Sequence, residues 1–296
     1  MERITYLERP DLRRPYLIIG FEGWPNAAEV SSSAIQYLVE ALEAKKFASI
    51  PAENFYDLSS SRPVGVIRDG RLIELKYPSN HFYYVRTSFS NDLILFQGIE
   101  PHLRWSFFAD LILNLAEGFD VPQIFTVGGT YDFVPHTYPP VVSGLFNHED
   151  LREEVLRAGI GLTEYSGPIS IHTFIQEAAR KRGLRVISLW GHAPQYLQGK
   201  NIKVVGAVLK SLVNLTHIEV DLSELERAGD YFDQQVNRIV EQDPKLQEVI
   251  SKLEEAYRRS GRFPPPSKKE EGSAEDKVVY IQAFLKRQED EEKRDG

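Results

Sequence analysis

The chain has no cysteine among its 296 residues. Disulfide bonds, thiolate metal sites and a cysteine nucleophile are therefore all excluded. No uninterrupted apolar run approaches the roughly 20 residues that a membrane-spanning helix needs. The amino-terminal segment MERITYLERPDLRR lacks the apolar core of a signal peptide. Together these absences predict a cytoplasmic protein with no membrane association.

Positive charge is also in the minority. The 35 lysines and arginines face 43 aspartates and glutamates, which gives a net charge of -8. A general nucleic-acid binder usually carries a basic face, so we expect no nucleic-acid partner. The contents of 42% hydrophobic and 26% charged residues are ordinary for a globular protein. The length allows one large domain or two modest ones.

Strand-like apolar runs alternate with helical periodicity through the first two-thirds of the chain. The expected strands cover residues 16–21, 47–50, 93–98, 123–129 and 184–190. The expected helices start at about Asn26 and cover residues 102–117, 149–157, 173–182 and 203–215. This alternation predicts a three-layer α/β/α domain with right-handed crossovers.

Residues 64–76 depart from this pattern. Two strand-like runs flank Asp69-Gly70, a two-residue hairpin signal, because glycine readily adopts the positive φ that a type I′ turn demands. Residues 81–88 are interpreted as a third strand of the same insert. We therefore expect a small antiparallel unit inside the α/β/α domain.

The chain changes character at Asp221. Residues 221–260 predict amphipathic helices separated at Pro244, as a docking element or oligomer contact packed on residues 1–220. Residues 261–276 have the composition of a flexible linker. The last segment, 277–296, predicts a short amphipathic helix and tail, with an apolar stripe of Val278, Tyr280, Ile281, Phe284 and Leu285. Such a helix is suited to docking on its own body, a neighbouring subunit or a partner.

Glycine, proline, histidine and tryptophan cluster after four of the expected strands, where binding sites form in open α/β sheets. The candidate pocket residues there are Gly20, Gly23, Trp24, Asn26, Arg104, Gly128, Gly129, Asp132, His136, Trp190 and His192. All of them fall on one predicted edge of the sheet. That coincidence favours a shared pocket without specifying its chemistry.

Several chemistries remain open for this edge. Gly20 to Gly23 occupies the place of a phosphate loop, but neither dinucleotide-binding nor P-loop spacing is present, so a tight turn is the simpler interpretation. Arg104 is suited to holding a carboxylate or phosphate, but a surface arginine with an ion-pair partner is the favoured interpretation. His136 and Asp132 are candidates for an acid–base pair, and Trp24 or Trp190 is a candidate surface on which a small-molecule ligand could stack. No complete metal-ligand spacing accompanies them, so we expect neither a metal nor a cofactor.

These segments together resemble the PAC2 family, named for a proteasome assembly chaperone. The resemblance runs from about Leu17 to about Leu253. The motifs that carry it are G-x-x-G-W-x-x-A from Gly20, EPHLRW (100–105), VPHT (134–137), GPISI (167–171), SLW with P-x-Y-L (188–197) and VDLSELE (220–226). The resemblance implies an α/β/α fold similar to purine nucleoside phosphorylases, a tendency to form homo-oligomers and, from the eukaryotic members, a non-catalytic chaperone role.

The chain departs from that family pattern at three polar positions of the expected pocket. Asn26-Ala27-Ala28 replaces Asp-Ala-Gly, Tyr138 replaces an arginine, and Gln195 replaces a histidine. The chain also ends without the hydrophobic-Tyr-X tail through which some proteins dock on proteasomes. We therefore predict a homo-oligomeric, non-catalytic protein-binding or assembly-chaperone-type factor. A small-molecule enzyme or sensor, acting on a nucleoside or phosphate in a strand-end pocket, is the alternative, and a chiefly structural protein is a third possibility.

Overall fold

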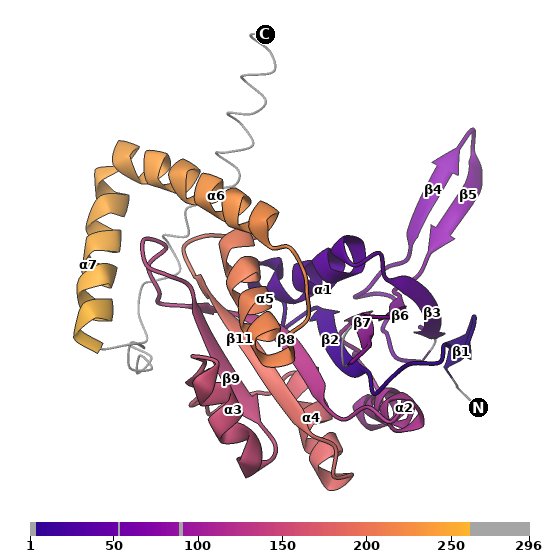
Figure 1. Ribbon diagram of the computed structural model, residues 1–296. Coiled ribbons are helices and arrows are strands. Elements are labelled where there is room, and N and C mark those ends of the chain that lie inside the picture. The colour runs from indigo at the N-terminus through magenta and orange to yellow at the C-terminus, as the bar shows by residue number, and fades with distance from the viewer. Residues whose placement is uncertain (1–3, 53, 89–90, 261–296) are drawn as a thin grey trace.

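The computed structural model describes residues 4–52, 54–88 and 91–260, and its core is a nine-stranded mixed sheet (Figure 1). The strand order is β1-β3-β6-β7-β2-β8-β11-β9-β10. The strands are β1 (Thr5–Tyr6), β2 (Tyr16–Glu22), β3 (Lys45–Ile50), β6 (Asn80–Val85), β7 (Leu93–Ile99), β8 (Ile124–Asp132), β9 (Val141–Phe146), β10 (Gly161–Leu162) and β11 (Val186–Pro194). The helices are α1 (Val30–Ala41), α2 (Trp105–Gly118), α3 (Arg152–Arg157), α4 (Ile171–Lys181), α5 (Ile202–Thr216), α6 (Ser223–Gln242) and α7 (Pro244–Ser260).

The centre of the sheet is parallel and its flanks are mostly antiparallel. Strands β7, β2, β8 and β11 pair in parallel, whereas β6 and β9 run antiparallel to their neighbours β7 and β11. The central strand β2 is buried along most of its length, as expected for a continuous apolar run covered on both faces. The parallel strands bring their carboxyl ends to one edge of the sheet, where the candidate residues lie.

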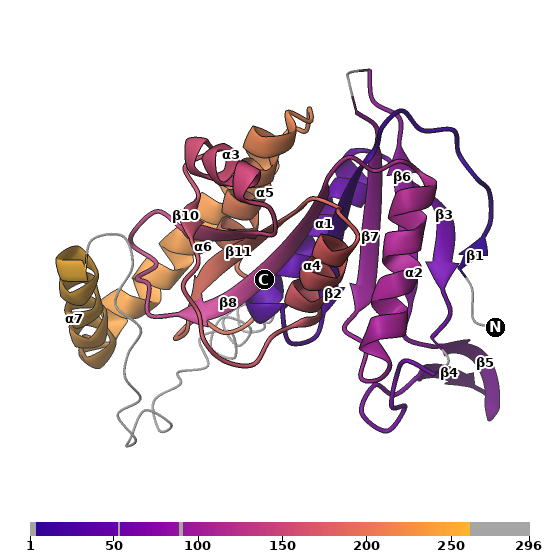
Figure 2. The same cartoon turned by 90° about the horizontal axis from the view of Figure 1, so that it is seen from below.

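Helices cover both faces of the sheet, so the α/β/α prediction is confirmed (Figure 2). On one face, α2 and α4 pack their apolar sides against Phe21, Phe96 and their neighbours. On the other face, α1 and α5 pack against Ile18, Val127 and Leu189. Successive residues of each central strand point to opposite faces, so one strand serves both cores.

The expected hairpin forms, but its expected third strand does not belong to it. Strands β4 (Val64–Arg68) and β5 (Arg71–Lys76) make a separate two-stranded sheet. Asp69 and Gly70 have φ of 47° and 72°, the two positive values of a type I′ turn. Residues 80–85 instead form β6 in the main sheet, between β3 and β7. The apolar Phe82 explains this, because it is fully buried and lies 4.6 Å from Phe96 between ring centroids.

Three local features differ from expectation. A 3-10 turn, η1 (Ala27–Glu29), precedes α1, so the helix begins four residues after Asn26. Helix α2 begins at Trp105, because Arg104 has a left-handed φ of 59°. A further strand, β9, follows the prolines of the 133–140 loop, where no strand was expected.

The carboxyl-terminal helices form as predicted, and Pro244 begins the second of them. Helix α6 lies along α5, and Val236, Ile239 and Leu246 form a small core with Leu197. No helix in the described part of the chain has the length and apolarity to cross a membrane. The predicted linker 261–276 and terminal helix 277–296 lie outside the described residues, and the division into domains stays a prediction.

Candidate functional site

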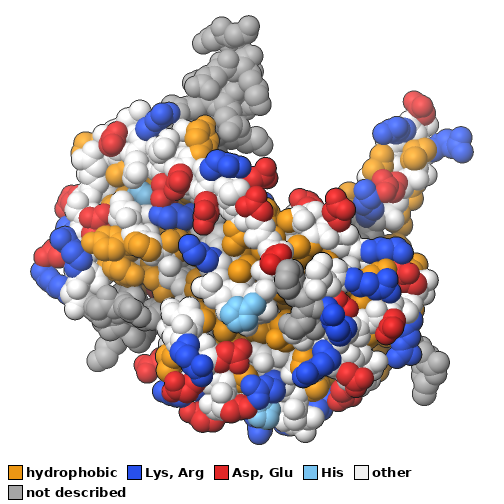
Figure 3. All heavy atoms as spheres, in the orientation of Figure 1, with side chains coloured by type: hydrophobic (Ala, Val, Ile, Leu, Met, Phe, Trp, Pro, Cys, Tyr) orange, Lys and Arg blue, Asp and Glu red, His pale blue; other side chains and the backbone are white. Residues whose placement is uncertain are grey.

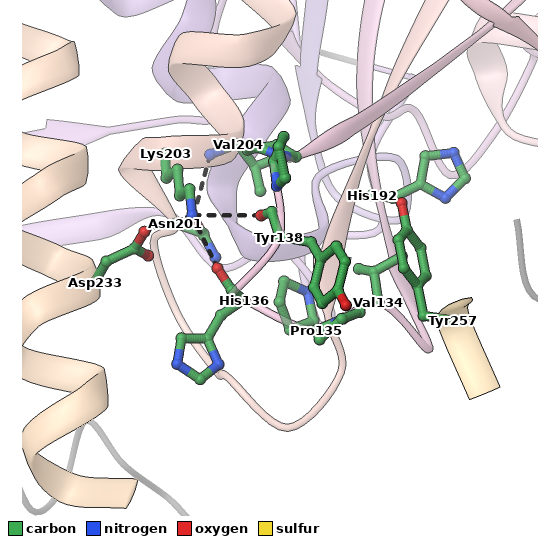
Figure 4. A pocket seen from close by; sticks show the side chains of 13 residues that line it. Val134, Pro135, His136, Tyr138, His192, Asn201, Lys203, Val204, Asp233 and Tyr257 are labelled. Carbon is green, nitrogen blue, oxygen red and sulfur yellow. Dashed lines mark hydrogen bonds and ion pairs between the residues drawn. The ribbon is translucent and has the colours of Figure 1, made fainter. Parts of the chain in front are cut away.

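The carboxyl ends of the central strands border a shallow hollow (Figure 4). Its walls come from the loop 133–140, the end of β11, the start of α5, and helices α6 and α7. The hollow has about 10 Å³ of free space, which is about the volume that one water molecule requires. Small-molecule pockets are usually about 300–1,000 Å³. The chain's own side chains therefore fill this part of the edge almost completely.

Lys203 at the start of α5 is the central cation of the hollow. Its Nζ donates hydrogen bonds to the backbone carbonyls of His136 at 2.8 Å and Tyr138 at 3.4 Å. It also forms an ion pair with Asp233 of α6. Figure 4 shows the ammonium between these groups, with its donors directed at the protein. Lys203 thus holds the loop and α6 together and offers little to a ligand.

His136 is held as a neutral imidazole. Tyr196 donates its hydroxyl to Nδ1 at 2.7 Å and accepts the His136 backbone N–H, while Nε2 donates to Oδ1 of Asn237 at 3.0 Å. Burial lowers the pKa of His136; the Asn237 hydrogen bond and the charge of Asp233 raise it, but less. Both ring nitrogens are engaged by the protein, so the ring anchors α6 on the 133–140 loop.

A second histidine completes an Asp132–His192–Ser143 chain. Nδ1 of His192 donates to Asp132 at 2.7 Å, and the Ser143 hydroxyl donates to Nε2 at 2.8 Å. Burial raises the pKa of Asp132, but the hydrogen bond and charge of His192 outweigh this and hold that pKa below its usual value. Thr163 donates in turn to the Ser143 oxygen. The order of hydrogen bonds is that of a catalytic triad.

In the Asp132–His192–Ser143 series the order of exposure is the reverse of what a catalytic triad requires, because the residue in the nucleophile's place is the most buried. Ser143, in the place of the nucleophile, is 1% exposed, whereas the Asp132 side chain is 26% exposed. A nucleophile must be reached by its substrate, and the hydroxyl of Ser143 lies inside the sheet between Thr163 and His192. The arrangement joins β8, β9 and β11, and supplies no accessible nucleophile.

The candidate glycines are explained by close packing. A Cβ on Gly129 would lie 2.3 Å from the carbonyl oxygen of Ala27, and one on Gly128 would lie 2.9 Å from the Trp190 ring. A Cβ on Gly20 would lie 2.4 Å from Ile35. Glycine lets the strands approach the helices and Trp190 closely at these positions. None of the three is needed to approach a phosphate.

Asn26 and Trp190 also have structural partners. Oδ1 of Asn26 accepts the backbone N–H of Ser32 at 2.9 Å, so its side chain caps the first turn of α1 from outside the helix. The indole N–H of Trp190 donates to Ser188 at 3.0 Å, and its ring lies 5.7 Å from the buried His172. Trp190 is thus part of the packing between β11 and α4.

A second part of the edge is organised by Glu100. Its Oε2 accepts the backbone N–H of Trp24 at 3.1 Å, and its Oε1 accepts that of Ile171 at 2.9 Å. Gly23 has φ of 108° and lies against the Cβ of Glu100. The Arg104 guanidinium lies 4.9 Å from the Phe107 ring centroid, at cation–π distance. The loops after β2 and β7 and before α4 are therefore joined at one carboxylate.

The structure separates the candidate residues into these two regions. His136 and His192 line the hollow, and Asp132 reaches it through His192. Gly23, Trp24 and Arg104 belong to the Glu100 region. The remaining candidates have the structural contacts described above: Gly20, Asn26, Gly128, Gly129 and Trp190. The expected pairing of His136 with Asp132 is wrong, because the two side chains have different partners. Within the described ranges, no group of three histidine, aspartate or glutamate side chains could hold a metal ion.

Sequence reasoning missed the groups that close the hollow. Lys203, Tyr196 and Asp233 come from segments interpreted only as helix starts, strand ends or docking surface. Ser143 lies in the strand that was not expected. The proximity of Tyr196 to the VPHT motif had no signal in the sequence, since 60 residues separate it from His136.

Known proteins are similar to this chain in fold and in sequence. The profile of the PAC2 family matches residues 20–240, well over half of the chain. The crystal structure of a PAC2 family protein from Streptomyces avermitilis MA has a TM-score of 0.72 and 29% identity, covering 79% of this chain and 99% of its own. The Mycobacterium tuberculosis proteasome-assembly chaperone homologue Rv2125 has a TM-score of 0.73 and 26% identity, with coverage of 79% and 99%.

A third structure extends the likeness of the fold. A protein of unknown function from Corynebacterium glutamicum ATCC 13032 has a TM-score of 0.79 at 23% identity, covering 87% of this chain and 97% of its own. At that identity the likeness concerns the fold alone. The family profile and the fold agree with the motifs from Gly20 to VDLSELE, and this chain belongs to the PAC2 family.

Proposed function

We propose that this chain is a non-catalytic, homo-oligomeric assembly factor that binds subunits of a larger protein complex. Membership of the PAC2 family supports this proposal. So does the similarity to Rv2125, which is described as a proteasome-assembly chaperone homologue. The partner class proposed from that similarity is the set of subunits that build the proteasome core.

The observation that carries the proposal is the filled strand-end edge. Lys203, His136 and His192 each have protein partners for their polar side-chain atoms. The free space of about 10 Å³ is far below the size of a nucleoside site. The buried Ser143 supplies no accessible nucleophile. An edge of this kind offers a surface for binding and does not enclose a substrate.

The surface that we assign to the partner lies around Glu100. Trp24, Leu103 and Ile169 are large apolar side chains that stand roughly half exposed on the loops joined there. Exposed aromatic and aliphatic groups near an arginine such as Arg104 are typical of protein-binding sites. The Glu100 carboxylate holds the backbone of two of these loops in place. Because the loops are already ordered, little conformational entropy is lost when a partner binds.

Binding is tested with the purified full chain and proteasome core subunits from the same source, observed by native mass spectrometry. We expect a complex with the wild type and at least about tenfold weaker binding by Trp24→Ser/Leu103→Ser, equivalent to ~1.4 kcal/mol. The matched control is Tyr231→Ser, which removes an exposed aromatic side chain from α6. Absence of any complex with the wild type would contradict the proposed partner.

The enzyme alternative has its own test. A specific ligand at 100 times its Kd stabilises a protein by about 2.7 kcal/mol. We expect no thermal shift of this size with nucleosides, phosphate or ribose phosphates. A shift that His136→Ala abolishes would replace the assembly-factor proposal with a small-molecule site.

A further inference from the structure

Helices α6 and α7 supply part of the wall of the hollow and are joined there to the α/β/α body by polar contacts (Figure 4). Three of these contacts are the Lys203–Asp233 ion pair and the hydrogen bonds of His136 to Asn237 and of Thr137 to Glu254. In each of the three, the body supplies the donor and the helices supply the acceptor oxygen. We call the donors, Lys203, His136 and Thr137, the donor strip. The two helices lie on this strip as an acceptor-bearing ligand would.

The outer face of the same helices has a different pattern. Acidic and basic side chains are interspersed over α6 and α7 in Figure 3. On α7, Lys252 pairs with Glu248 and Arg259 pairs with Glu255, and all four side chains are more than half exposed. The one-directional pattern at the donor strip is therefore a property of that contact and not of the composition of the two helices.

The segment α6–α7 is held more firmly at its start than beyond it. Leu225, in the first turn of α6, belongs to the large core that α5 shares with the sheet. Further along, Val236, Ile239 and Leu246 form a separate small core with Leu197. Segments with few buried apolar contacts open at a low cost in free energy. We therefore expect the far end of α6, together with α7, to open while the start of α6 stays attached.

The fit of Asp233 on the donor strip is incomplete. Its Oδ2 binds Lys203, whereas its Oδ1 is buried without a hydrogen-bond partner. A buried carboxylate oxygen of this kind has lost its hydration and gained no hydrogen bond in exchange. A ligand that pairs both of its oxygens would bind the same surface more favourably, and a ligand that binds the open state shifts the chain towards that state.

The contacts also describe the ligand that this surface fits. Asp233 and Asn237 are four residues apart, so they lie on the same face of α6. Val236 and Ile239, which are 0% and 9% exposed, are the apolar residues beside them. The pattern is that of an amphipathic helix that presents a carboxylate and, one turn later, a second acceptor oxygen. Docking of an amphipathic helix on a complementary surface is a common mode of protein recognition.

We propose that α6–α7 is an autoinhibitory segment, and that the donor strip beneath it is a docking site for an acidic amphipathic helix of a partner protein. Binding of that helix displaces the far end of α6 and α7 from the body. The donor strip and the Glu100 region are different parts of the edge, so this inference goes beyond the proposed function.

The segment itself provides the probe for autoinhibition. A fluorescent peptide of residues 223–242 is titrated into the full chain, and binding is followed by anisotropy. The released variant, Asp233→Ala/Glu254→Ala, lacks two acceptors of the intramolecular contact and keeps the donor strip. We expect it to bind the peptide at least about tenfold more tightly than the wild type does. The matched control, Glu255→Ala on the outer face of α7, should bind as the wild type does. Equal affinities of the released variant and the wild type would overturn autoinhibition.

Two further changes test the docking surface. Adding Lys203→Met to the released variant removes one donor, and we expect the peptide to bind at least about tenfold more weakly. Because this substitution also affects stability, the reciprocal change is made in the peptide, where Asp233→Ala/Asn237→Ala removes both acceptors and keeps the apolar side. We expect the same loss. Equal binding of the two peptides by the released variant would overturn the assignment of the donor strip, and the capture of proteasome subunits remains a separate result.

Discussion

Replacing Lys203 with methionine tests whether the hollow is a structural clasp. Lys203→Met keeps most of the apolar stem and removes the ammonium. The His136 and Tyr138 carbonyls then lose a donor, and Asp233 loses its cationic partner. Because Oδ1 of Asp233 is already buried without a partner, the substitution leaves a largely uncompensated carboxylate.

The expected magnitude follows from the burial of this ion pair. Removing one member of a fully buried pair costs about 3–5 kcal/mol. Both side chains here are 24% exposed, so solvent screening reduces the expected loss to about 2–3 kcal/mol. For a chain of this size, that corresponds to a fall in Tm of about 5–10 °C.

Urea unfolding of the full chain, followed by circular dichroism, measures this loss. The control is Lys252→Met, because Lys252 pairs with Glu248 on α7 while 73% exposed. We expect a change below about 0.5 kcal/mol there. Adding Asp233→Asn to Lys203→Met should recover part of the loss, since the unpaired charge disappears. A Lys203→Met protein as stable as the wild type would refute the clasp.

Three further predictions concern buried groups. The imidazole of His172 is fully buried and neither of its ring nitrogens has a hydrogen-bond partner, and burial lowers its pKa to about 3. Below about pH 6.5 this histidine is protonated in the unfolded chain but stays neutral in the folded chain, so the free energy of unfolding falls by about 2 kcal/mol from pH 6.5 to 5. His172→Phe should remove that part of the fall, which is measured by urea unfolding at the two pH values. Ser143 should resist a fluorophosphonate serine probe, because it is 1% exposed; labelling of the wild type but not of Ser143→Ala would show that the site opens. Gly129→Ala should cost about 3 kcal/mol of unfolding free energy, since its Cβ meets the Ala27 carbonyl at 2.3 Å, whereas Gly206→Ala, with 3.8 Å to its nearest neighbour, should not destabilise; equal effects would contradict the packing argument.

The fold was largely predictable because its signals are local. The apolar run of β2, the helical periodicity of α5 and the Asp69-Gly70 turn each depend on neighbouring residues, and each element formed. The location of β6 was not predictable in this way. Its sequence suits a strand next to the hairpin or in the main sheet, and the burial of Phe82 against Phe96 favours the main sheet.

The candidate site was predictable only as a region. The strand-end clusters do lie at one edge, because parallel strands carry their carboxyl ends there. Which side chains pair was not predictable from spacing. Asp132 and His136 are four residues apart, yet Asp132 binds His192 and His136 binds Tyr196, because β11 lies beside β8 and extends the full length of that strand.

The sequence by itself determined the α/β/α architecture, the hairpin turn, the helices from Asp221 to Ser260 and the family, since periodicity, turn chemistry and motifs are properties of short segments. The tertiary structure alone decided that the hollow at the strand ends is nearly filled and that Ser143 is out of reach. These are properties of burial, and burial depends on which distant segments the folded chain brings together.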